Sequence, residues 1–486
     1  MSGIVLGKDE YRDKVYACWL GKNIGGTLGG PWECRKYVND LTFYDPVPDG
    51  SAANDDLDLQ LVWLKMMEDR GVPPKLPHFA EYWARYTCAY PWNEYGFCMR
   101  NLDRGLRPPI SGCFENYYVD EMGSPIRSEI WACIAPADPQ RAAALAWMDS
   151  AMDHAGGEGT HGEMFWAAVE SAAFVMDDPV ELIRLGLAMI PISCAISRSI
   201  REALWCWQSG KRWAEARQRV LDNFGHNNPC DAKANHGFTV LGWLYGEDFG
   251  DQLCRAVNCG YDTDCTGATL GSLLGLLGGT AGIPKKWSDP VGTDIVLHKF
   301  TGDCDAPKTL DELTDRTLAL AETLGAVTLG GQTTLPPGAK ALLFRNEQAK
   351  AARAQDVNAA VELDGDLEII LHYNGDPVLT PGIGRRMDVS LRRGGEPAHG
   401  EVALVVPDGW QAARSGPASF DVSAGDVADR NTVEVTAAVG GAERSASFVV
   451  LGPGAATGFP ASVNIEKCPT CSGRKGSCVC VREGRN

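Results

Sequence analysis

The sequence predicts an all-α domain followed by a small antiparallel β-sandwich, and three observations support this expectation. Ala-rich apolar stretches, as in residues 142–148 and 165–174, have the composition of buried helices. After about residue 335, short β-like runs alternate with Gly, Pro and Asp. Of the 17 cysteines, 13 lie between Cys18 and Cys304 and none follows until Cys468, which indicates two parts with different cores.

Three regions are expected along the chain: the all-α domain over residues 1–330, the β-sandwich over 338–455 and a Cys-rich basic tail over 462–486. The helical part is expected to contain close helix contacts, because Gly interrupts its apolar stretches, as in residues 270–277. The β-sandwich carries no obvious catalytic cluster, so its role stays open. Its strands are expected at residues 367–371, 389–391, 402–406, 433–435 and 448–450.

Length and charge limit the classes of function. With 486 residues, 44% of them hydrophobic, the chain has material for several domains and a sizeable core. A formal net charge of −18 disfavours broad contacts with nucleic acid or an anionic membrane. Charges interrupt the first 22 residues and no apolar run is long enough to span a bilayer. We therefore expect a cytoplasmic protein with mostly reduced thiols, and the sequence predicts no oligomeric state.

A Gly-rich stretch follows the first apolar run and ends at a single acid, Glu33. It reads Gly21-Lys-Asn-Ile-Gly-Gly-Thr-Leu-Gly-Gly-Pro-Trp-Glu33. Such a stretch is typical of close helix packing or of a loop that cradles a ligand, and packing is the more common case. No strand precedes it, so it is not a dinucleotide-binding fingerprint.

Carboxylates gather in two further segments. Asn54-Asp-Asp-Leu-Asp58 precedes an apolar run with helical spacing, so its acids are expected at a helix start, where they could act as caps and dipole partners. Three acids in four residues exceed what one cap needs, and convergent oxygens suit Mg²⁺ or Mn²⁺. Asp262-Thr-Asp264 stands beside a Gly-rich apolar helix, where buried acids need a partner such as a metal ion.

The order of these motifs resembles the ADP-ribosylglycohydrolase family, over about residues 11 to 300. The resemblance implies an all-α fold with two divalent ions, usually Mg²⁺ or Mn²⁺, in a central cleft. It also implies hydrolysis of a ribosyl glycosidic bond. The motifs that carry it are Gly21-x-x-x-Gly25-x-x-Leu28-Gly29-x-Pro31-x-Glu33, Asn54-Asp55-Asp56, Asp153-His154 and Gly260-Tyr261-Asp262-Thr263-Asp264.

Site residues follow from this resemblance. It implies catalytic roles for Glu33 and Asp56, and substrate contacts for Gly29, His154, Tyr261 and Arg127. The implied metal ligands are Asn54, Asp55, Asp56, Asp262, Asp264 and, at a position where the family usually supplies a Thr oxygen, Cys265 or its neighbour Thr266. A thiol is a poor ligand for a hard ion, so Thr266 or water could take the place of Cys265.

Two other positions depart from the family pattern. Gly26 stands where many members carry Asp, and Tyr261 replaces the second Gly of a usual Gly-Gly-Asp-Thr-Asp segment. A tyrosine there is expected to reshape the pocket, by stacking on a base or a sugar. The substrate is therefore expected to be an ADP-ribosylated protein or a ribosyl small molecule, with another furanoside or nucleoside as the first alternative. A non-catalytic binding protein with the same fold is the second alternative.

Two residues outside the acidic clusters have competing interpretations. His154 is interpreted as positioning a ligand; a zinc site with His161 is the alternative, although their spacing fits no standard zinc pattern. Arg127 could bind a phosphate or a sugar, and a structural ion pair with Glu129 is the alternative.

The C-terminal segment carries four cysteines in a locally basic context. Cys468-Pro-Thr-Cys471 and Cys478-Val-Cys480 could form a small tetrathiolate Zn²⁺ site. A second CxC is less typical of such sites than a second CxxC, so a tail of free thiols is the alternative.

Overall fold

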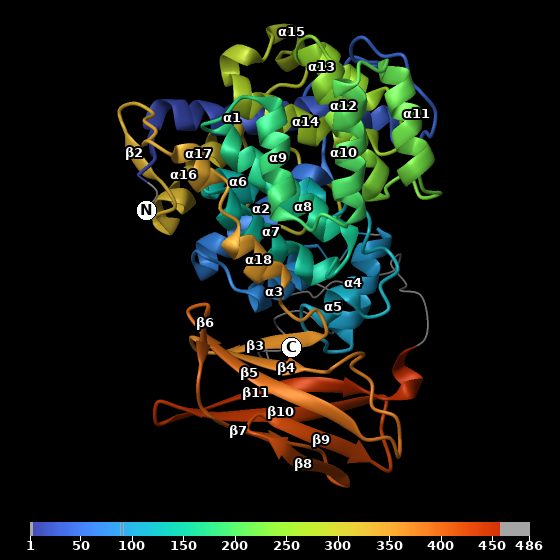
Figure 1. The fold of residues 1–486 in the computed structure, drawn as a ribbon, viewed down its shortest axis with the longest axis vertical. Coiled ribbons are helices and arrows are strands. Elements are labelled where there is room, and N and C mark those ends of the chain that lie inside the picture. Colours follow the sequence, from blue (N-terminus) through green and yellow to red (C-terminus); the bar gives the residue numbers. More distant parts are fainter. Residues whose placement is uncertain (1–2, 88, 91, 457–486) are drawn as a thin grey trace. The chain divides into compact units, whose positions relative to one another are not determined.

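The computed structural model describes residues 3–87, 89–90 and 92–456 (Figure 1). The predicted tail at 462–486 lies outside the described residues, and so do the predicted Zn²⁺ ligands Cys468, Cys471, Cys478 and Cys480. No helix of the described part is both long enough and apolar enough to cross a bilayer.

The described residues form two compact units that do not follow the order of the chain. The first unit takes its residues from Met1–Pro74, Asp120–Ser150 and Gly157–Ala354, and the second from Lys75–Val119, Ala151–Gly156 and Gln355–Asn486. The second unit thus combines the β-strands with a stretch from the first part of the sequence. The domain limits expected from the sequence stay a prediction.

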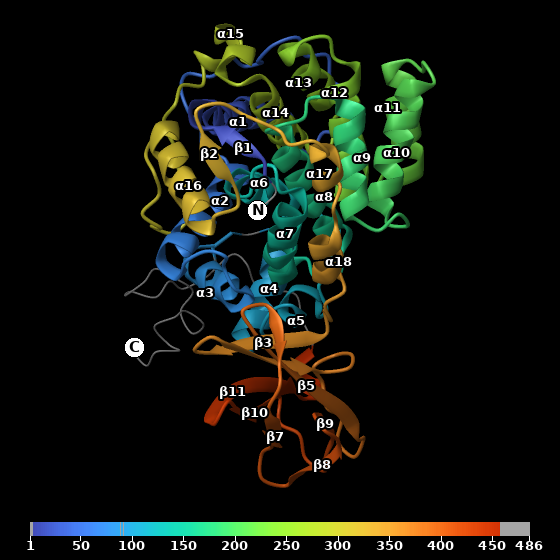
Figure 2. The same ribbon diagram turned by 60° about the vertical axis from the view of Figure 1, so that its left-hand side comes forward.

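The first unit is almost entirely helical, as predicted for the first part of the chain. Its only strands among the described residues are β1 (Val5–Gly7) and β2 (Thr328–Gly330), which pair in parallel. Both strands are labelled in Figure 2. Its helices are α1 (Lys8–Gly29), α2 (Asp55–Arg70), α6 (Ser128–Ile134), α7 (Pro139–Asp153, whose last residues belong to the second unit), α8 (Glu158–Ala173), α9 (Pro179–Met189), α10 (Ala195–Gln208), α11 (Trp213–Phe224), α12 (Ala232–Tyr245), α13 (Phe249–Val257), α14 (Thr263–Gly278), α15 (Lys285–Ser288), α16 (Leu310–Leu324), α17 (Ala339–Leu343) and α18 (Glu347–Arg353), with short 3₁₀ turns η1 (Gly30–Trp32), η2 (Pro125–Arg127) and η3 (Thr280–Gly282).

Glycines bring α1 and α14 into backbone contact in an antiparallel arrangement. The two helices lie side by side in both ribbon views (Figures 1 and 2). A Cβ added at Gly21 or Gly25 would come closer than 3.0 Å to the carbonyl oxygen of Gly271 or Gly267, respectively. Added at Gly29, it would meet Thr263 in the same way. The Gly-rich stretch therefore serves helix packing, the more common of the two uses considered from the sequence.

The second unit joins a two-sheet β-sandwich to three short helices, α3 (Leu76–Tyr86), α4 (Asn93–Asp103) and α5 (Ile110–Cys113). One sheet has the strand order β11-β10-β7 and the other β3-β4-β5-β9-β8, with β6 paired to β5; every pairing is antiparallel. The strands are β3 (Ala359–Asp364), β4 (Leu367–His372), β5 (Arg385–Arg393), β6 (Glu396–Ala398), β7 (Glu401–Val405), β8 (Trp410–Gly416), β9 (Ser419–Ala424), β10 (Arg430–Val439) and β11 (Ala442–Leu451), followed by the 3₁₀ turn η4 (Pro453–Ala456).

The inner faces of both sheets share one apolar core, which confirms the predicted β-sandwich. Strand β10 alternates buried and exposed residues along its length, as a strand with one face on a core requires. Leu106, Ile110 and Phe114, from the helical stretch of the same unit, belong to this core. The Val361 amide also donates to the Pro108 carbonyl over 3.0 Å, which ties that stretch to β3.

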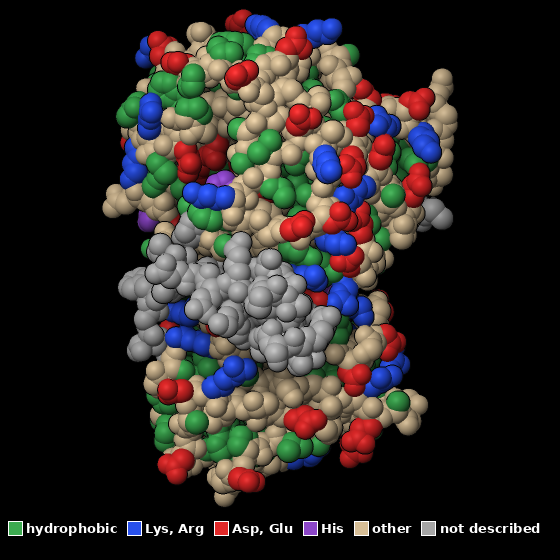
Figure 3. All heavy atoms as spheres, turned by 180° about the vertical axis from the view of Figure 1, so that it is seen from behind, with side chains coloured by type: hydrophobic (Ala, Val, Ile, Leu, Met, Phe, Trp, Pro, Cys, Tyr) green, Lys and Arg blue, Asp and Glu red, His purple; other side chains and the backbone are tan. Residues whose placement is uncertain are grey.

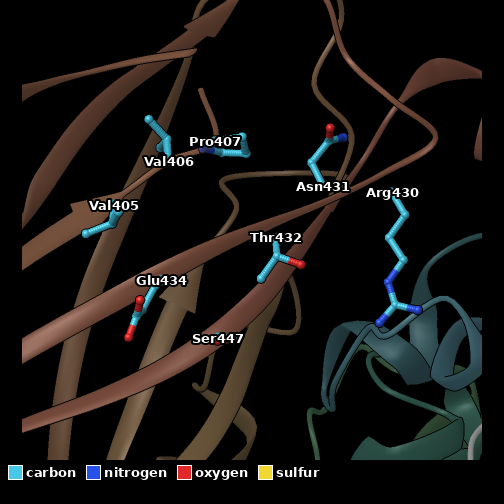
Figure 4. A pocket seen from close by; sticks show the side chains of 8 residues that line it. All are labelled: Val405, Val406, Pro407, Arg430, Asn431, Thr432, Glu434 and Ser447. Atoms are coloured by element: carbon cyan, nitrogen blue, oxygen red, sulfur yellow. The ribbon is translucent and has the colours of Figure 1, made fainter. Parts of the chain in front are cut away.

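The β-sandwich also carries an open hollow of about 450 Å³ along β10. Figure 4 shows the side chains of Arg430 and Glu434 at opposite ends of this hollow. Its lining is otherwise made of small apolar and uncharged polar residues.

The α1–α14 contact predicts a sharp difference between two glycines of α14. Gly271→Ala should destabilise the protein by about 3 kcal/mol, because its new Cβ would overlap the Gly21 carbonyl and force the helices apart. Gly278→Ala, in the last turn of the same helix, meets nothing within 4 Å and should be neutral or slightly stabilising. Urea unfolding of both variants measures the difference, and equal stabilities would contradict close packing at Gly271.

Candidate metal centre

The end of α1 and the start of α14 bring Glu33 next to Asp262 and Asp264. After η1 the chain turns at Cys34, which adopts a left-handed φ of 64°. The Cys34 amide donates to the Tyr261 carbonyl over 2.8 Å, and the Tyr261 amide donates to the Arg35 carbonyl over 2.7 Å. The Thr263 hydroxyl also donates to the Gly29 carbonyl over 2.8 Å. These bonds join the two helix ends on either side of the acidic residues.

Helix α2 supplies the next carboxylates from its first turn. Asn54 is the N-cap residue, and its side-chain oxygen accepts from the Asp56 amide over 2.9 Å. Asp56 is fully buried, whereas Asp55 is half-buried. Asp58 lies apart from this group: its Oδ2 accepts from the His298 amide and the Thr301 hydroxyl. Asn54 thus acts as a helix cap, the first use considered for this segment. Asp56 has buried oxygens suited to a cation, the second use considered.

Two overlapping groups of metal-type donors result. Oxygens of Glu33, Asp262 and Asp264 lie within 4.8 Å of one another, and so do donor atoms of Asp56, Asp264 and Cys265. Asp264 belongs to both groups. Seen from behind, acidic side chains gather in a hollow on the helical part of the molecule (Figure 3).

Burial and mutual repulsion raise the pKa of every carboxyl in these groups. Burial is the main cause for Asp56, Asp262 and Asp264, and the neighbouring carboxylates add to it. At Glu33 the Asp264 charge is the largest cause and burial the second, and together they raise its pKa to about 9. A site of this kind must hold protons or cations at neutral pH.

The available oxygens fit a divalent cation. Both carboxylate oxygens of Asp56, and Oδ1 of Asp262 and of Asp264, are buried with no hydrogen-bond partner among the described residues. Leaving such atoms without partners is costly, and oxygen-rich groups of this charge are the ligands that Mg²⁺ and Mn²⁺ prefer. The Cys265 thiol is the one soft donor among them.

A fully buried ion pair lies close to Asp56. The Lys22 ammonium lies 2.8 Å from the Glu129 carboxylate and donates to the Ile126 carbonyl over 3.0 Å. The Gln60 amide nitrogen donates to the other Glu129 oxygen and to the Asp56 carbonyl, over 2.8 and 2.9 Å. The Lys22 charge also lowers the pKa of Asp56, in opposition to burial. Sequence reasoning missed Lys22 and Gln60; a lysine inside an otherwise apolar and Gly-rich helix is the signal that marks Lys22.

Other predicted ligands have partners of their own. The Asn54 oxygen is engaged as the α2 cap, although a carbonyl oxygen has a second lone pair for a cation. The Thr266 hydroxyl is buried and donates to the Thr263 carbonyl over 3.3 Å. The Cys265 thiol lies in the donor group with Asp56 and Asp264.

The structure also places the predicted substrate residues of the first unit. Gly29 lies in the α1–α14 contact. The Tyr261 ring is 7% exposed and packs on Phe238, with ring centroids 5.6 Å apart, and its φ of 73° is left-handed. Arg127 is fully buried and lies 2.8 Å from Asp149. Burial of the Tyr261 ring and the Arg127 guanidinium gives no support to the predicted stacking or phosphate contacts.

His154 belongs to the second unit. It is fully buried, and its Nδ1 lies 3.0 Å from the Asp153 carboxylate. His161, the partner considered for a zinc site, belongs to the first unit and lies in a donor group with Glu158 and Cys194. The role of His154 in substrate binding stays a prediction.

Comparisons with known proteins agree with this chemistry. A family model described as ADP-ribosylglycohydrolase matches residues 7–327. One solved structure, an ADP-ribosylglycohydrolase-related protein complex, shares 18% identity over 65% of this chain and 99% of its own, with a TM-score of 0.44; a likeness this distant adds no argument. No curated protein matches the chain.

The raised pKa values predict how cation binding depends on pH. Each carboxyl has a higher pKa in the folded protein than in the unfolded chain, so the ion-free fold is favoured at low pH. For Glu33 this stability is lost as the pH rises from its ordinary pKa of 4.5 through about 9. Mn²⁺ should relieve the repulsion, raising the melting temperature by about 5 °C near pH 8 and by less near pH 6.

Thermal unfolding with and without Mn²⁺ at the two pH values tests this expectation. Asp69→Asn, an exposed change at the far end of α2, should keep the full shift, whereas Asp264→Asn should reduce it. A Mn²⁺ shift that is absent, or that decreases towards higher pH, would rule out cation binding by these carboxylates.

Proposed function

Because the chain belongs to the ADP-ribosylglycohydrolase family, we propose that it is a divalent-metal-dependent hydrolase of ADP-ribosyl or related ribosyl glycosidic bonds. One observation carries the proposal: Glu33, Asp56, Asp262 and Asp264 converge from three separate segments. Among the described residues, no hydrogen-bond partner is found for buried carboxylate oxygens of Asp56, Asp262 and Asp264. A structural role would require partners for these oxygens, whereas a cation site requires them free.

Asp56, Asp262 and Asp264 would hold the ions, together with Asp55, the Asn54 oxygen and either Cys265 or Thr266. Mg²⁺ or Mn²⁺ bound there supplies positive charge that orients ribose hydroxyls and makes a nearby water more acidic. Cys265 favours Mn²⁺ over Mg²⁺, because the softer ion tolerates a sulfur neighbour better. Asp264, present in both donor groups, is the residue best placed to contact two ions.

Glu33 is proposed to move the proton. Its pKa of about 9 means that the carboxyl carries a proton at neutral pH when the centre holds no cation. Cations bound at the centre would lower this pKa, so the carboxylate could accept a proton from the attacking water and, once protonated, give one to the leaving group. Glu33 is also exposed, unlike Asp56 and Asp262, so a substrate can reach it.

The buried carboxylates would act through their negative charge. Cleavage at an anomeric carbon passes through an oxocarbenium-like transition state, which nearby negative groups stabilise. The main chain of Asp56 is held by the α2 cap and by Gln60, so the position from which its carboxylate extends is fixed before substrate arrives. In this proposal Asp56 is catalytic through charge and position, and Glu33 through its proton.

Activity assays test the proposal directly. With Mn²⁺ or Mg²⁺, purified protein should release ADP-ribose from ADP-ribosylated proteins or small conjugates, and a chelator should abolish the release. Glu33→Gln and Asp264→Asn should each lower kcat about 100-fold or more, with Asp69→Asn as the matched control on α2.

Different outcomes separate the alternatives for the substrate. Turnover of nucleosides or aryl ribofuranosides, with none of ADP-ribose conjugates, would assign another furanoside as the substrate. No metal-dependent turnover of any of these, with Mn²⁺ binding intact, would favour a non-catalytic binding protein.

A further inference from the structure

Glu33 belongs to a third donor group, formed with two cysteines that the hydrolytic chemistry does not use. Donor atoms of Glu33, Cys34 and Cys230 lie within 4.8 Å of one another. Glu33 and Cys34 are exposed and Cys230 is half-buried, so the group is open to solvent. Cys230 comes from the segment between α11 and α12, almost 200 residues from Cys34 in the chain.

Hydrogen bonds of the main chain hold both cysteines in place. The Cys34 amide donates to the Tyr261 carbonyl, as described above. On the other side, the Cys230 amide donates to the Asn228 side-chain oxygen over 3.1 Å, and the Cys230 carbonyl accepts from the Met122 amide over 2.9 Å. The Lys36 ammonium donates to the Asn227 carbonyl and so joins the two segments directly. The thiols therefore face each other without a conformational change.

The spacing of the donors fits a tetrahedral ion. Zn²⁺ binds sulfur at about 2.3 Å and carboxylate oxygen at about 2.0 Å, which places donors about 3.5 Å apart at the corners of a tetrahedron. The Cys34 sulfur lies 3.6 Å from Glu33 Oε1. Two sulfurs and one oxygen form a borderline-soft set that selects Zn²⁺ and similar ions over Mg²⁺. Three protein ligands leave the fourth corner to water.

Another candidate group, formed by Glu158, His161 and Cys194, is already used by the fold. Both Glu158 oxygens accept from main-chain amides at the start of α10, over 2.7 and 2.9 Å. The Cys194 sulfur accepts from the Ser197 amide as the cap of the same helix. Its donors serve as helix caps, whereas the Cys34 thiol donates to Glu33 Oε1, a member of its own group.

We propose that Glu33, Cys34 and Cys230 form a binding site for a thiophilic divalent cation of the zinc class, separate from the centre at Asp56, Asp262 and Asp264. Binding replaces the thiol protons, which pass to solvent. Glu33 is shared between the two sites, so an ion held by the cysteines removes this side chain from hydrolysis. This inhibitory consequence rests on the proposed function; the binding itself does not.

Metal binding by the full-length, reduced protein tests the site without any substrate. Mg²⁺ in excess fills the carboxylate centre, and replacing Cys468, Cys471, Cys478 and Cys480 by Ser removes the predicted thiol site of the tail. Co²⁺ should then give thiolate-to-cobalt charge-transfer bands, and equilibrium dialysis should detect the matching Zn²⁺. Cys34→Ser and Cys230→Ser should each abolish the bands and lose one bound Zn²⁺ per chain. Cys194→Ser, which changes the thiol of another donor group, should keep both signals.

Two results would overturn the assignment. The first is Zn²⁺ and Co²⁺ binding by Cys34→Ser and Cys230→Ser equal to that of the parent protein. The second is a Cys34–Cys230 disulfide that forms in air, seen as a mass loss of the thiol hydrogens, while the reduced protein binds no Zn²⁺.

Inhibition is measured separately from binding. If the protein hydrolyses a ribosyl substrate with Mn²⁺, the Zn²⁺ concentration that halves the rate should rise at least about 10-fold in Cys230→Ser. Failure of the hydrolase assay leaves the binding result unaffected. An unchanged Zn²⁺ sensitivity in an active Cys230→Ser protein would refute the sharing of Glu33.

Discussion

The close contact between α1 and α14 is the constraint on which the rest of the first unit depends. Gly21, Gly25 and Gly29 recur every four residues, so they form one stripe on α1, and they meet Gly271, Gly267 and Thr263 on α14. The helices run antiparallel, so the C-terminal end of α1 reaches the N-terminal end of α14. Glu33 follows the first end and Asp262 precedes the second. Without the glycines, side chains would separate the helices and move these carboxylates apart.

This contact stabilises the helix pair, but it also brings carboxylates that repel one another together at the end of the pair. Carboxylates that repel one another and have left water raise each other's pKa values, so the ion-free site opposes folding at neutral pH. Lys22, the residue that follows Gly21, supplies one buried positive charge, but its direct partner is Glu129. The remaining repulsion is removed by protons or cations. The negative net charge of the whole chain therefore does not predict the charge inside this site, where protons or cations must offset the carboxylates.

Sequence patterns predicted the helices and most strands of the sandwich because each depends on local spacing of apolar residues. The carboxylate segments were equally visible, since Asp55, Asp56, Asp262 and Asp264 occur in short motifs. Long-range partners could not be found in this way. Nothing local connects Cys34 with Cys230, or Lys22 with Glu129, and no pattern indicated that residues 75–119 join the core of the β-sandwich unit. Those pairings depend on how distant helices pack.

Gly26 and Tyr261, which depart from the family pattern, each have a local explanation in the structure. The Asn54 amide nitrogen occupies the space where a Cβ at residue 26 would lie, so Asn54 in this conformation excludes the side chain that many members carry there. The glycine at residue 26 and the conformation of Asn54 are therefore coupled. Tyr261 is different, because its φ of 73° favours glycine and costs about 1 kcal/mol for a side chain. The packing of its ring on Phe238 offsets that cost and fixes the segment that leads into Asp262. The tyrosine thus acts from within the protein, on the position of the segment that carries Asp262 and Asp264.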